Sequence, residues 1–135
     1  MILGIGLDLI DCRRITKVIE RQGQRFLERV FTLDEQKRCQ NKYHSSQSFG
    51  KVYAAKEAVV KAIGNVQGIH WKHIEIRHFF NGRPCVNLKD RALHNFKDLI
   101  PLGMKGKIDL SIADEPPYAQ AFVIISAIPF QKPDF

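Results

Sequence analysis

The sequence predicts an α+β fold in which helices pack on a mainly antiparallel sheet. A segment with the composition of a long helix occupies residues 46–63, near the middle of the chain. Segments that alternate apolar and polar residues, as half-buried strands do, follow this helix. Short turn sequences separate several of these strand-like segments, and only antiparallel neighbours can be joined by such short connections.

The N-terminal segment 2–10 is β-branched and apolar apart from two glycines and Asp8, which predicts a strand. Glycine inside a strand often marks a close approach of a ligand or another backbone. From 11 to 22 the apolar residues recur with a helical period, and Gly23 is expected to end or bend that helix. We expect a short turn at 25–30.

Two helices are expected next. Thr32 and Glu35 have the spacing of a capping box, in which each side chain bonds to the other residue's backbone N–H. This predicts a short helix that runs to about Cys39. The longer helix at 46–63 is rich in residues with high helix propensity, and Gly64 stands where a C-terminal cap belongs.

The second half of the chain contains mainly strand and turn patterns. Asn-Gly is the strongest short hairpin sequence, and Pro-Pro also indicates a turn. After a loop that contains Trp71, we expect a strand at 73–79, a hairpin turn at Asn81-Gly82, a strand at 85–88, a helix at 90–99, strands at 107–113 and 118–127 around Pro116-Pro117, and a loose tail at 129–135.

Length and composition are those of one globular domain, which we expect to span residues 1–135. No run approaches the ~18 apolar residues that a membrane-spanning helix needs. The three cysteines are odd in number and show no CxxC spacing, so we expect neither a disulfide framework nor a zinc site, and a cytoplasmic location. The net charge of +7 favours an anionic partner, such as nucleic acid, a membrane face, a phosphorylated metabolite or an acidic protein.

Asp8 is the first candidate for a chemical role. An ionised carboxylate within an apolar strand is costly unless a cation or several hydrogen-bond donors meet it. An equally acceptable interpretation places Asp8 at the end of the strand, where it caps the following helix.

The second candidate is one face of the long helix. Tyr53, Glu57, Lys61 and Gly64 share this face, since they recur at i, i+4, i+8 and i+11. Taken alone, Glu57 and Lys61 could be a solvated ion pair. The alanines around them leave room for a bulky ligand, and two carboxylates with a nearby lysine suit Mg²⁺ and phosphate.

The third candidate is a basic stripe on the first helix, made of Arg14, Lys17 and Arg21. A solvated surface is the ordinary interpretation of such charges. Three like charges on one face repel one another, however, and an acidic helix of a partner would relieve that repulsion. No aromatic residues interleave with them as in many nucleic-acid-binding surfaces.

Other common chemistries lack sequence support. The chain has no GK[ST] phosphate loop, no GxSxG motif around Ser111, and no metal-ligand spacing among its five histidines. A non-catalytic nucleic-acid-binding module stays open as a rival on the basis of charge, with a membrane-surface protein behind it.

Several motifs together resemble the holo-[acyl-carrier-protein] synthases, the small trimeric branch of the 4′-phosphopantetheinyl transferases. The resemblance covers nearly the whole chain, and its most specific part is the Ala-Ala-Lys-Glu-Ala block with a downstream Lys and Gly. The matching segments are Gly4-Ile5-Gly6-Leu7-Asp8, Arg14-Ile15, Arg29-Val30-Phe31-Thr32 with Glu35, residues 54–64, Asn81-Gly82-Arg83-Pro84, Leu110-Ser111-Ile112-Ala113-Asp114 and Tyr118-Ala119.

The resemblance implies transfer of 4′-phosphopantetheine from coenzyme A to a serine of acyl carrier protein, for fatty acid biosynthesis, with release of 3′,5′-ADP. It implies that Asp8 and Glu57 hold Mg²⁺ and that Lys61 lies beside the pyrophosphate of coenzyme A. Glu57, or a metal-bound water that it contacts, would take the serine proton. It also implies a homotrimer with active sites at subunit boundaries, and no nucleic-acid or membrane partner.

By the same resemblance, Arg14, Lys17 and Arg21 face the acidic recognition helix of acyl carrier protein. Lys51, Gly64 and Arg83 are the further residues expected at coenzyme A.

Two positions depart from the pattern of many relatives. Val52 stands where an arginine is common, and Asp114 stands where some relatives have histidine. A phosphate contact at position 52 is therefore absent or supplied by Lys51.

Overall fold

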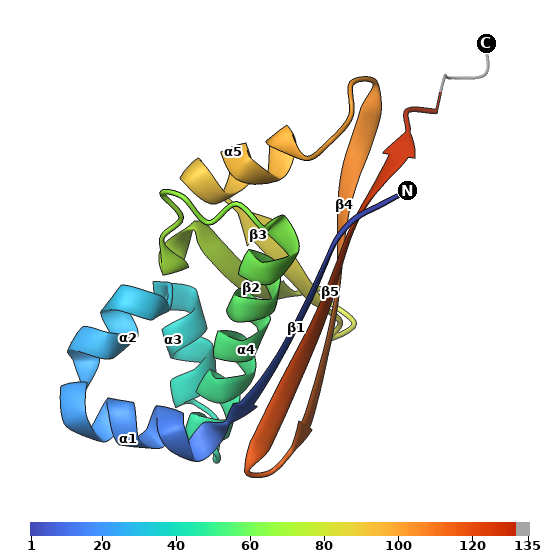
Figure 1. Cartoon of the computed structure of the whole chain (residues 1–135). Helices are drawn as coiled ribbons and strands as arrows, with labels where there is room; N and C mark the ends of the chain where they lie inside the picture. The colour runs from blue at the N-terminus through green and yellow to red at the C-terminus, as the bar shows by residue number, and fades with distance from the viewer. Residues whose placement is uncertain (132–135) are drawn as a thin grey trace.

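The computed structural model describes residues 1–131, and Figure 1 shows how its helices and strands are arranged. The elements in chain order are β1 (Ile2–Asp11), α1 (Cys12–Gln22), α2 (Gln24–Val30), α3 (Leu33–Gln40), α4 (Ser45–Ile63), the 3₁₀ helix η1 (Trp71–His73), β2 (Ile74–His78), β3 (Pro84–Leu88), α5 (Asp90–Asp98), β4 (Met104–Glu115) and β5 (Tyr118–Pro129). This confirms the predicted α+β class.

The strands form a three-stranded antiparallel sheet in the order β1-β5-β4 and a separate β2-β3 hairpin. In the larger sheet, Leu7 of β1 lies opposite Phe122 of β5, which in turn lies opposite Ser111 of β4. Side chains alternate between faces, so this register assigns each residue of the sheet to one of two surfaces. The helices lie on one side of the sheet in Figure 1.

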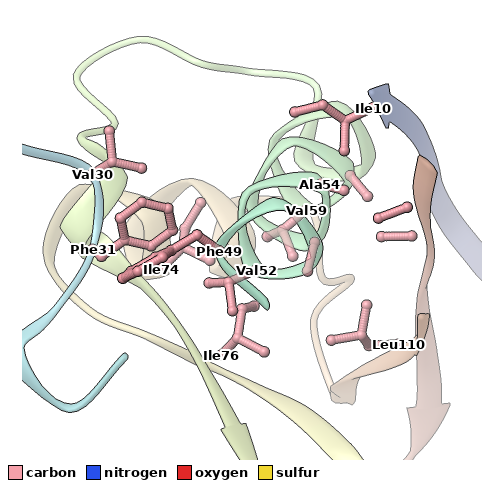
Figure 2. Close-up of a cluster of buried hydrophobic side chains, with 14 of the residues drawn as sticks. Ile10, Val30, Phe31, Phe49, Val52, Ala54, Val59, Ile74, Ile76 and Leu110 are labelled. Atoms are coloured by element: carbon pink, nitrogen blue, oxygen red, sulfur yellow. The ribbon is translucent and has the colours of Figure 1, made fainter. Parts of the chain in front are cut away.

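Helix α4 is the centre of the core. It contacts β1, β5, α1, α3, β2 and β4. The carbonyl of Ala58 meets Gly6 of β1, and the ring of Phe49 contacts that of Phe31 with centroids 4.8 Å apart. Figure 2 shows this helix between Ile10 and Leu110 on one side and a group formed by Val30, Phe31, Ile74 and Ile76 on the other. A helix that is buried on several sides needs apolar residues around most of its circumference. The buried residues of α4 are mostly apolar and lie on several of its sides.

Two glycines let β1 approach α4 closely. A Cβ at Gly6 would lie 1.7 Å from the backbone O of Ala58, and a Cβ at Gly4 would lie 2.0 Å from the backbone O of Ala62. Neither approach is possible for a residue with a side chain. The glycines of the first predicted strand therefore mark contact with another backbone.

A buried ion pair joins α4 to the segment before it. Lys56 is fully buried, its Nζ lies 2.6 Å from Oε1 of Glu35, and it also donates to the backbone O of Val30 at 2.7 Å. Burial lowers the pKa of Lys56, while the charge of Glu35 opposes that shift. Glu35 also accepts from the backbone N–H of Ile76 at 2.8 Å, so one carboxylate connects α3, α4 and β2.

The structure corrects several sequence predictions. Residues 24–30 form helix α2 instead of a turn, since Phe26, Leu27 and Val30 bury one helical face. Strand β4 extends from Met104 to Glu115, beyond the predicted 107–113, because it pairs with β5 along its whole length. Pro129 ends β5 instead of belonging to the tail, of which residues 132–135 lie outside the described part.

The capping box is confirmed. The backbone N–H of Glu35 donates to Oγ1 of Thr32 at 3.3 Å, and the N–H of Thr32 donates to Oε1 of Glu35 at 2.8 Å. The hairpin at Asn81-Gly82 and the turn at Pro116-Pro117 also lie where the sequence predicts them.

Candidate active site

Asp8 and Glu57 line the same pocket, which has a volume of about 210 Å³ and lies between β1, α1 and α4. Arg14 of α1 and Tyr53 of α4 also line it. Two carboxylates that are far apart in the sequence thus meet beside a cationic side chain.

The strand register explains how Asp8 reaches this pocket. Asp8 shares a face of β1 with Gly6 and Ile10, and this is the face on which α4 packs. Glu57 precedes Ala58, whose carbonyl meets Gly6. The close approach of the two backbones therefore brings the carboxylate of the strand to that of the helix.

Lys61 lies one helical turn beyond Glu57 and pairs with Asp8. Its Nζ is 3.1 Å from Oδ1 of Asp8 and donates to the backbone O of Leu7 at 2.9 Å. The Asp8 side chain is 15% exposed and that of Lys61 is 52% exposed, so the lysine can reach a ligand in solvent without leaving the site.

The electrostatics of the pocket favour a cation. Burial raises the pKa of Glu57, and the negative charge of Asp8 raises it further. Burial likewise raises the pKa of Tyr53, and the charge of Glu57 adds to that effect. Two neighbouring carboxylates repel each other when both are ionised, and a divalent cation would remove this repulsion.

The donor set suits Mg²⁺. This ion takes one or two protein carboxylates and completes its coordination with waters and substrate oxygens. Within residues 1–131, no group of three or more His, Cys, Asp and Glu side chains is placed to hold a metal. Asp8 and Glu57 have the oxygen donors that would hold a hydrated Mg²⁺ in this pocket.

The three residues of the basic stripe lie on α1. Arg14, Lys17 and Arg21 are all exposed. Arg14 differs from the other two because it also lines the pocket with Asp8 and Glu57. Arg14 is therefore close enough to contact both a docked partner and a ligand in the site.

The other residues predicted at coenzyme A are not gathered in this pocket. Gly64 caps α4 with φ of 80°, its N–H donating to the O of Val60. Lys51 lies 3.7 Å from Asp114, beside a different pocket of about 720 Å³. Arg83 lies in the β2-β3 connection, where its Nη2 is 4.0 Å from Oδ1 of Asp109.

The structure decides two alternatives that the residues alone leave open. Asp8 does not cap α1, because Asp11 does so by accepting from the N–H of Arg13 at 3.0 Å. The second alternative was an ion pair between Glu57 and Lys61 on the surface of one helix. The structure instead pairs Lys61 with Asp8 of β1, so the position of the lysine side chain depends on the tertiary fold.

The sequence places Tyr53 on the candidate face of α4 without indicating its role, and it does not indicate the larger pocket. Tyr53 stacks on Trp71, with ring centroids 5.2 Å apart, and lines the site beside Glu57. Its position four residues before Glu57 is the sequence pattern that places it on this helix face. The larger pocket is built by three separate segments and leaves no comparable pattern.

Comparisons with known proteins give the family and the fold of the chain. A family model described as the 4′-phosphopantetheinyl transferase superfamily matches residues 4–113. The chain is 48% identical to the holo-[acyl-carrier-protein] synthase of Rhodopseudomonas palustris, over 96% of this chain and 92% of the relative. It is 44% identical to the protein of the same name from Mesorhizobium japonicum, over 98% of each chain.

Solved structures of holo-[acyl-carrier-protein] synthases also resemble the fold of this chain. The holo-[acyl-carrier-protein] synthase of Neisseria meningitidis superimposes with a TM-score of 0.80 at 30% identity, covering 93% of this chain and 99% of that one. The Helicobacter pylori synthase, solved in complex with coenzyme A, superimposes with a TM-score of 0.76 at 27% identity, covering 90% and 99%.

Proposed function

This chain belongs to the 4′-phosphopantetheinyl transferase superfamily, and we propose that Asp8, Glu57 and Lys61 carry the reaction of that family here. The reaction transfers 4′-phosphopantetheine from coenzyme A to a serine of acyl carrier protein and releases 3′,5′-ADP. The observation that supports this site most directly is the meeting of two carboxylates and a lysine where β1 crosses α4.

In the reaction, the serine hydroxyl attacks the β-phosphate of coenzyme A, and the bond between the two phosphates breaks. Either Glu57 or a metal-bound water that it contacts would accept the serine proton, and the position of Glu57 in the pocket supports both alternatives. Lys61 stabilises the negative charge that develops on the departing phosphate. Mg²⁺ held by Asp8 and Glu57 would supply neutralisation of the pyrophosphate charge.

Mass spectrometry of an apo acyl carrier protein tests the activity directly. The carrier protein should gain one phosphopantetheine group on its serine when it is incubated with the chain, coenzyme A and Mg²⁺. Omission of coenzyme A is the control. An unmodified carrier protein under these conditions would contradict the proposed activity.

A thermal-shift comparison separates this function from the rival nucleic-acid-binding function, which rests on the net charge of +7. Coenzyme A with Mg²⁺ should raise the Tm, because a ligand that binds only the folded state stabilises it. A random oligonucleotide at the same charge concentration should leave the Tm unchanged. The reverse result would favour the rival.

Acyl carrier protein is proposed to dock on the basic stripe of α1. The three exposed charges of Arg14, Lys17 and Arg21 support this, because they suit an acidic helix. Arg14 extends from the stripe into the pocket of Asp8 and Glu57. A carrier protein docked there would bring its serine to the site.

Reversal of Lys17 and Arg21 to Glu should raise the KM for the carrier protein about tenfold or more, since each exposed pair contributes up to about 1 kcal/mol and reversal replaces attraction with repulsion. The KM for coenzyme A should change little. Added salt should raise the wild-type carrier KM, because screening acts over about 8 Å at physiological salt.

The matched control is reversal of Lys89 and Lys97 to Glu, at the two ends of α5. This pair makes the same change in net charge away from the stripe and should leave both KM values near those of the wild type. A parallel rise of both KM values in the Lys17 and Arg21 variant would place the stripe at the coenzyme site instead.

A homotrimer is proposed because one face of the larger sheet is both apolar and exposed. Ile5, Leu7 and Leu9 on β1 and Phe122 on β5 are 56%, 49%, 66% and 40% exposed. These residues share the surface opposite α4, which the helices in Figure 1 do not cover. Contiguous apolar surface of this kind is typical of an interface between subunits.

Sites at subunit boundaries would also account for Lys51 and Arg83, which line pockets separate from that of Asp8 within one chain. In the trimer, we propose that they contact coenzyme A bound at the carboxylates of a neighbouring subunit. Gly64 lies at the end of the same helix as Lys61 and would allow close approach of that ligand.

Leu7→Lys should convert the trimer to a monomer and lower the activity, because it places a charge in the apolar interface. Light scattering at several protein concentrations measures the assembly. Leu102→Lys is the control, since Leu102 is a fully exposed loop residue outside the sheet and should not alter assembly. A fully active monomer would contradict the shared site.

We also propose that the protein works in the cytoplasm. Its three cysteines are free thiols, which are usual in reducing compartments. No helix within residues 1–131 has the length and apolar character needed to cross a membrane.

A further inference from the structure

Tyr53 is a polar residue of the Asp8–Glu57 pocket that the proposed reaction does not use. It precedes Glu57 by four residues on α4, so the two side chains are neighbours on one face of the helix. Both side chains are half-buried, and both line the pocket. Tyr53 therefore brings a hydroxyl group, which can donate a hydrogen bond, to the carboxylate site.

The ring of Tyr53 is held by its stacking on Trp71. The two ring centroids are 5.2 Å apart, and the rings are inclined by 32°. Trp71 is fixed in turn by its backbone O, which accepts from Nζ of the buried Lys56 at 3.3 Å and from the N–H of Ile74 at the end of η1. A ring that stacks on a fixed partner has little freedom to rotate, so the hydroxyl of Tyr53 is held in one place.

The two carboxylates of the pocket differ in how they are held. Asp8 pairs with Lys61, whose Nζ lies 3.1 Å from Oδ1 of Asp8. For Glu57, residues 1–131 provide no ion pair within 4.0 Å. A glutamate side chain loses rotamer freedom when it binds an ion, and a neighbouring donor that already fixes the carboxylate reduces this cost.

The pKa shifts of Tyr53 and Glu57 reflect their proximity. Burial raises the pKa of Tyr53, and the charge of Glu57 and hydrogen bonding with it add to this effect. Burial and the charge of Asp8 raise the pKa of Glu57, whereas hydrogen bonding with Tyr53 lowers it. A donor that lowers the pKa of a carboxyl group stabilises the ionised form, which is the form that binds a metal ion.

We propose that Tyr53 is a positioning residue, whose hydroxyl donates to the Glu57 carboxylate and holds it in the orientation that binds Mg²⁺ together with Asp8. Tyr53 and Lys61 then have matching roles, since each holds one of the two carboxylates. Tyr53 acts through Glu57 and takes no part in the making or breaking of bonds. The inference rests on the proposed function in one respect, that Glu57 is a metal ligand.

Tyr53→Phe tests this role, because it removes the hydroxyl and keeps the ring that stacks on Trp71. Titration of the metal-free chain with Mn²⁺, followed by the EPR signal of the free ion, measures metal binding without turnover. Mn²⁺ is a suitable probe because carboxylates bind it as they bind Mg²⁺. The Kd for Mn²⁺ should rise about tenfold in the variant, the factor expected for loss of one hydrogen bond to a charged group.

Kinetics gives a second measurement, which a purely structural role of Tyr53 would not affect in the same way. The Mg²⁺ concentration for half-maximal transfer should rise by about the same factor as the Kd for Mn²⁺. The kcat at saturating Mg²⁺ and the KM for the carrier protein should stay near their wild-type values. A kcat that remains low at saturating Mg²⁺ would overturn the proposal, because the hydroxyl would then act in the chemical step itself.

Tyr118→Phe is the matched control. Tyr118 is an exposed residue at the start of β5 and does not line the pocket, so loss of its hydroxyl should leave the Kd for Mn²⁺ unchanged. Equal weakening in the two variants, an unchanged Kd in Tyr53→Phe, or a wild type that binds no Mn²⁺ would overturn the proposal. A wild type that binds Mn²⁺ but leaves the carrier protein unmodified would refute the proposed activity alone, since the Mn²⁺ titration would still measure the effect of Tyr53→Phe.

Discussion

Replacement of either Asp8 or Glu57 by its amide is expected to reduce transfer by roughly 10²–10³-fold or more, the cost of losing a group that stabilises transition-state charge. Asp8→Asn and Glu57→Gln preserve size, so the pocket between β1 and α4 should keep its shape. Each removes one of the two carboxylates that the proposed metal needs. The loss should therefore be seen mainly in kcat and in the concentration of Mg²⁺ required.

The stability of the metal-free Glu57→Gln variant should not fall as its activity does. The raised pKa of Glu57 means that the folded state disfavours its ionised form relative to the unfolded chain. Above that pKa, removal of the charge by Glu57→Gln should leave the Tm of the metal-free protein unchanged or higher. The Mg²⁺-dependent increase in Tm should disappear, which gives a measurement of metal binding that does not depend on activity.

Asp98→Asn is the control for these variants, since Asp98 is an exposed carboxylate of α5 whose salt-bridge partner among residues 1–131 is His94. It should retain wild-type rates. Near-normal transfer by Asp8→Asn or Glu57→Gln at limiting Mg²⁺ would show that the replaced residue is not a ligand.

Gly6→Ala should disrupt both the fold and the site. The added methyl group would lie 1.7 Å from the backbone O of Ala58, so β1 and α4 must move apart. Overpacking of this kind costs about 1–3 kcal/mol or more in the free energy of unfolding. Because β1 carries Asp8 and α4 carries Glu57, a displacement of about 1 Å should also lower kcat/KM by roughly 10²-fold.

Gly106→Ala provides the matched comparison on the same face of the sheet. Its new methyl group would meet the side-chain ends of Ile100 and Phe96, which can rotate away, instead of a backbone atom. Urea denaturation should show a smaller loss of stability than for Gly6→Ala, and transfer should persist. Equal losses in the two variants would mean that the backbone contact at Gly6 has no special role.

Local sequence patterns predicted the elements whose determinants are local. The capping box of Thr32 and Glu35 and the hairpin at Asn81-Gly82 depend on residues within a few positions of one another, and both were correct. Helix α2 was missed because it has only seven residues and begins immediately after Gly23, which ends α1. The spacing of Phe26, Leu27 and Val30 could have indicated it.

The site was predicted only in part, for a physical reason. The pairing of Lys61 with Asp8 depends on the register of β1 against α4, which no pattern within either segment specifies. The same holds for the Lys56–Glu35 pair, since a lysine in the middle of a helix is usually solvated. Likewise, a small pocket of about 150 Å³ is lined by residues of α3, α4, β2 and β4, and no sequence spacing indicates it.

The close crossing of β1 and α4 affects how the sequence of any relative should be interpreted. Part of the motif that identifies the family serves this crossing, since Gly4 and Gly6 meet the backbone of Ala62 and Ala58. A descendant that lost catalysis but kept its shape would still conserve these residues. A match to these motif residues therefore indicates that a relative has this architecture. If Asp8, Glu57 and Lys61 have the roles proposed above, a relative that lacks them would be a pseudoenzyme with the same fold.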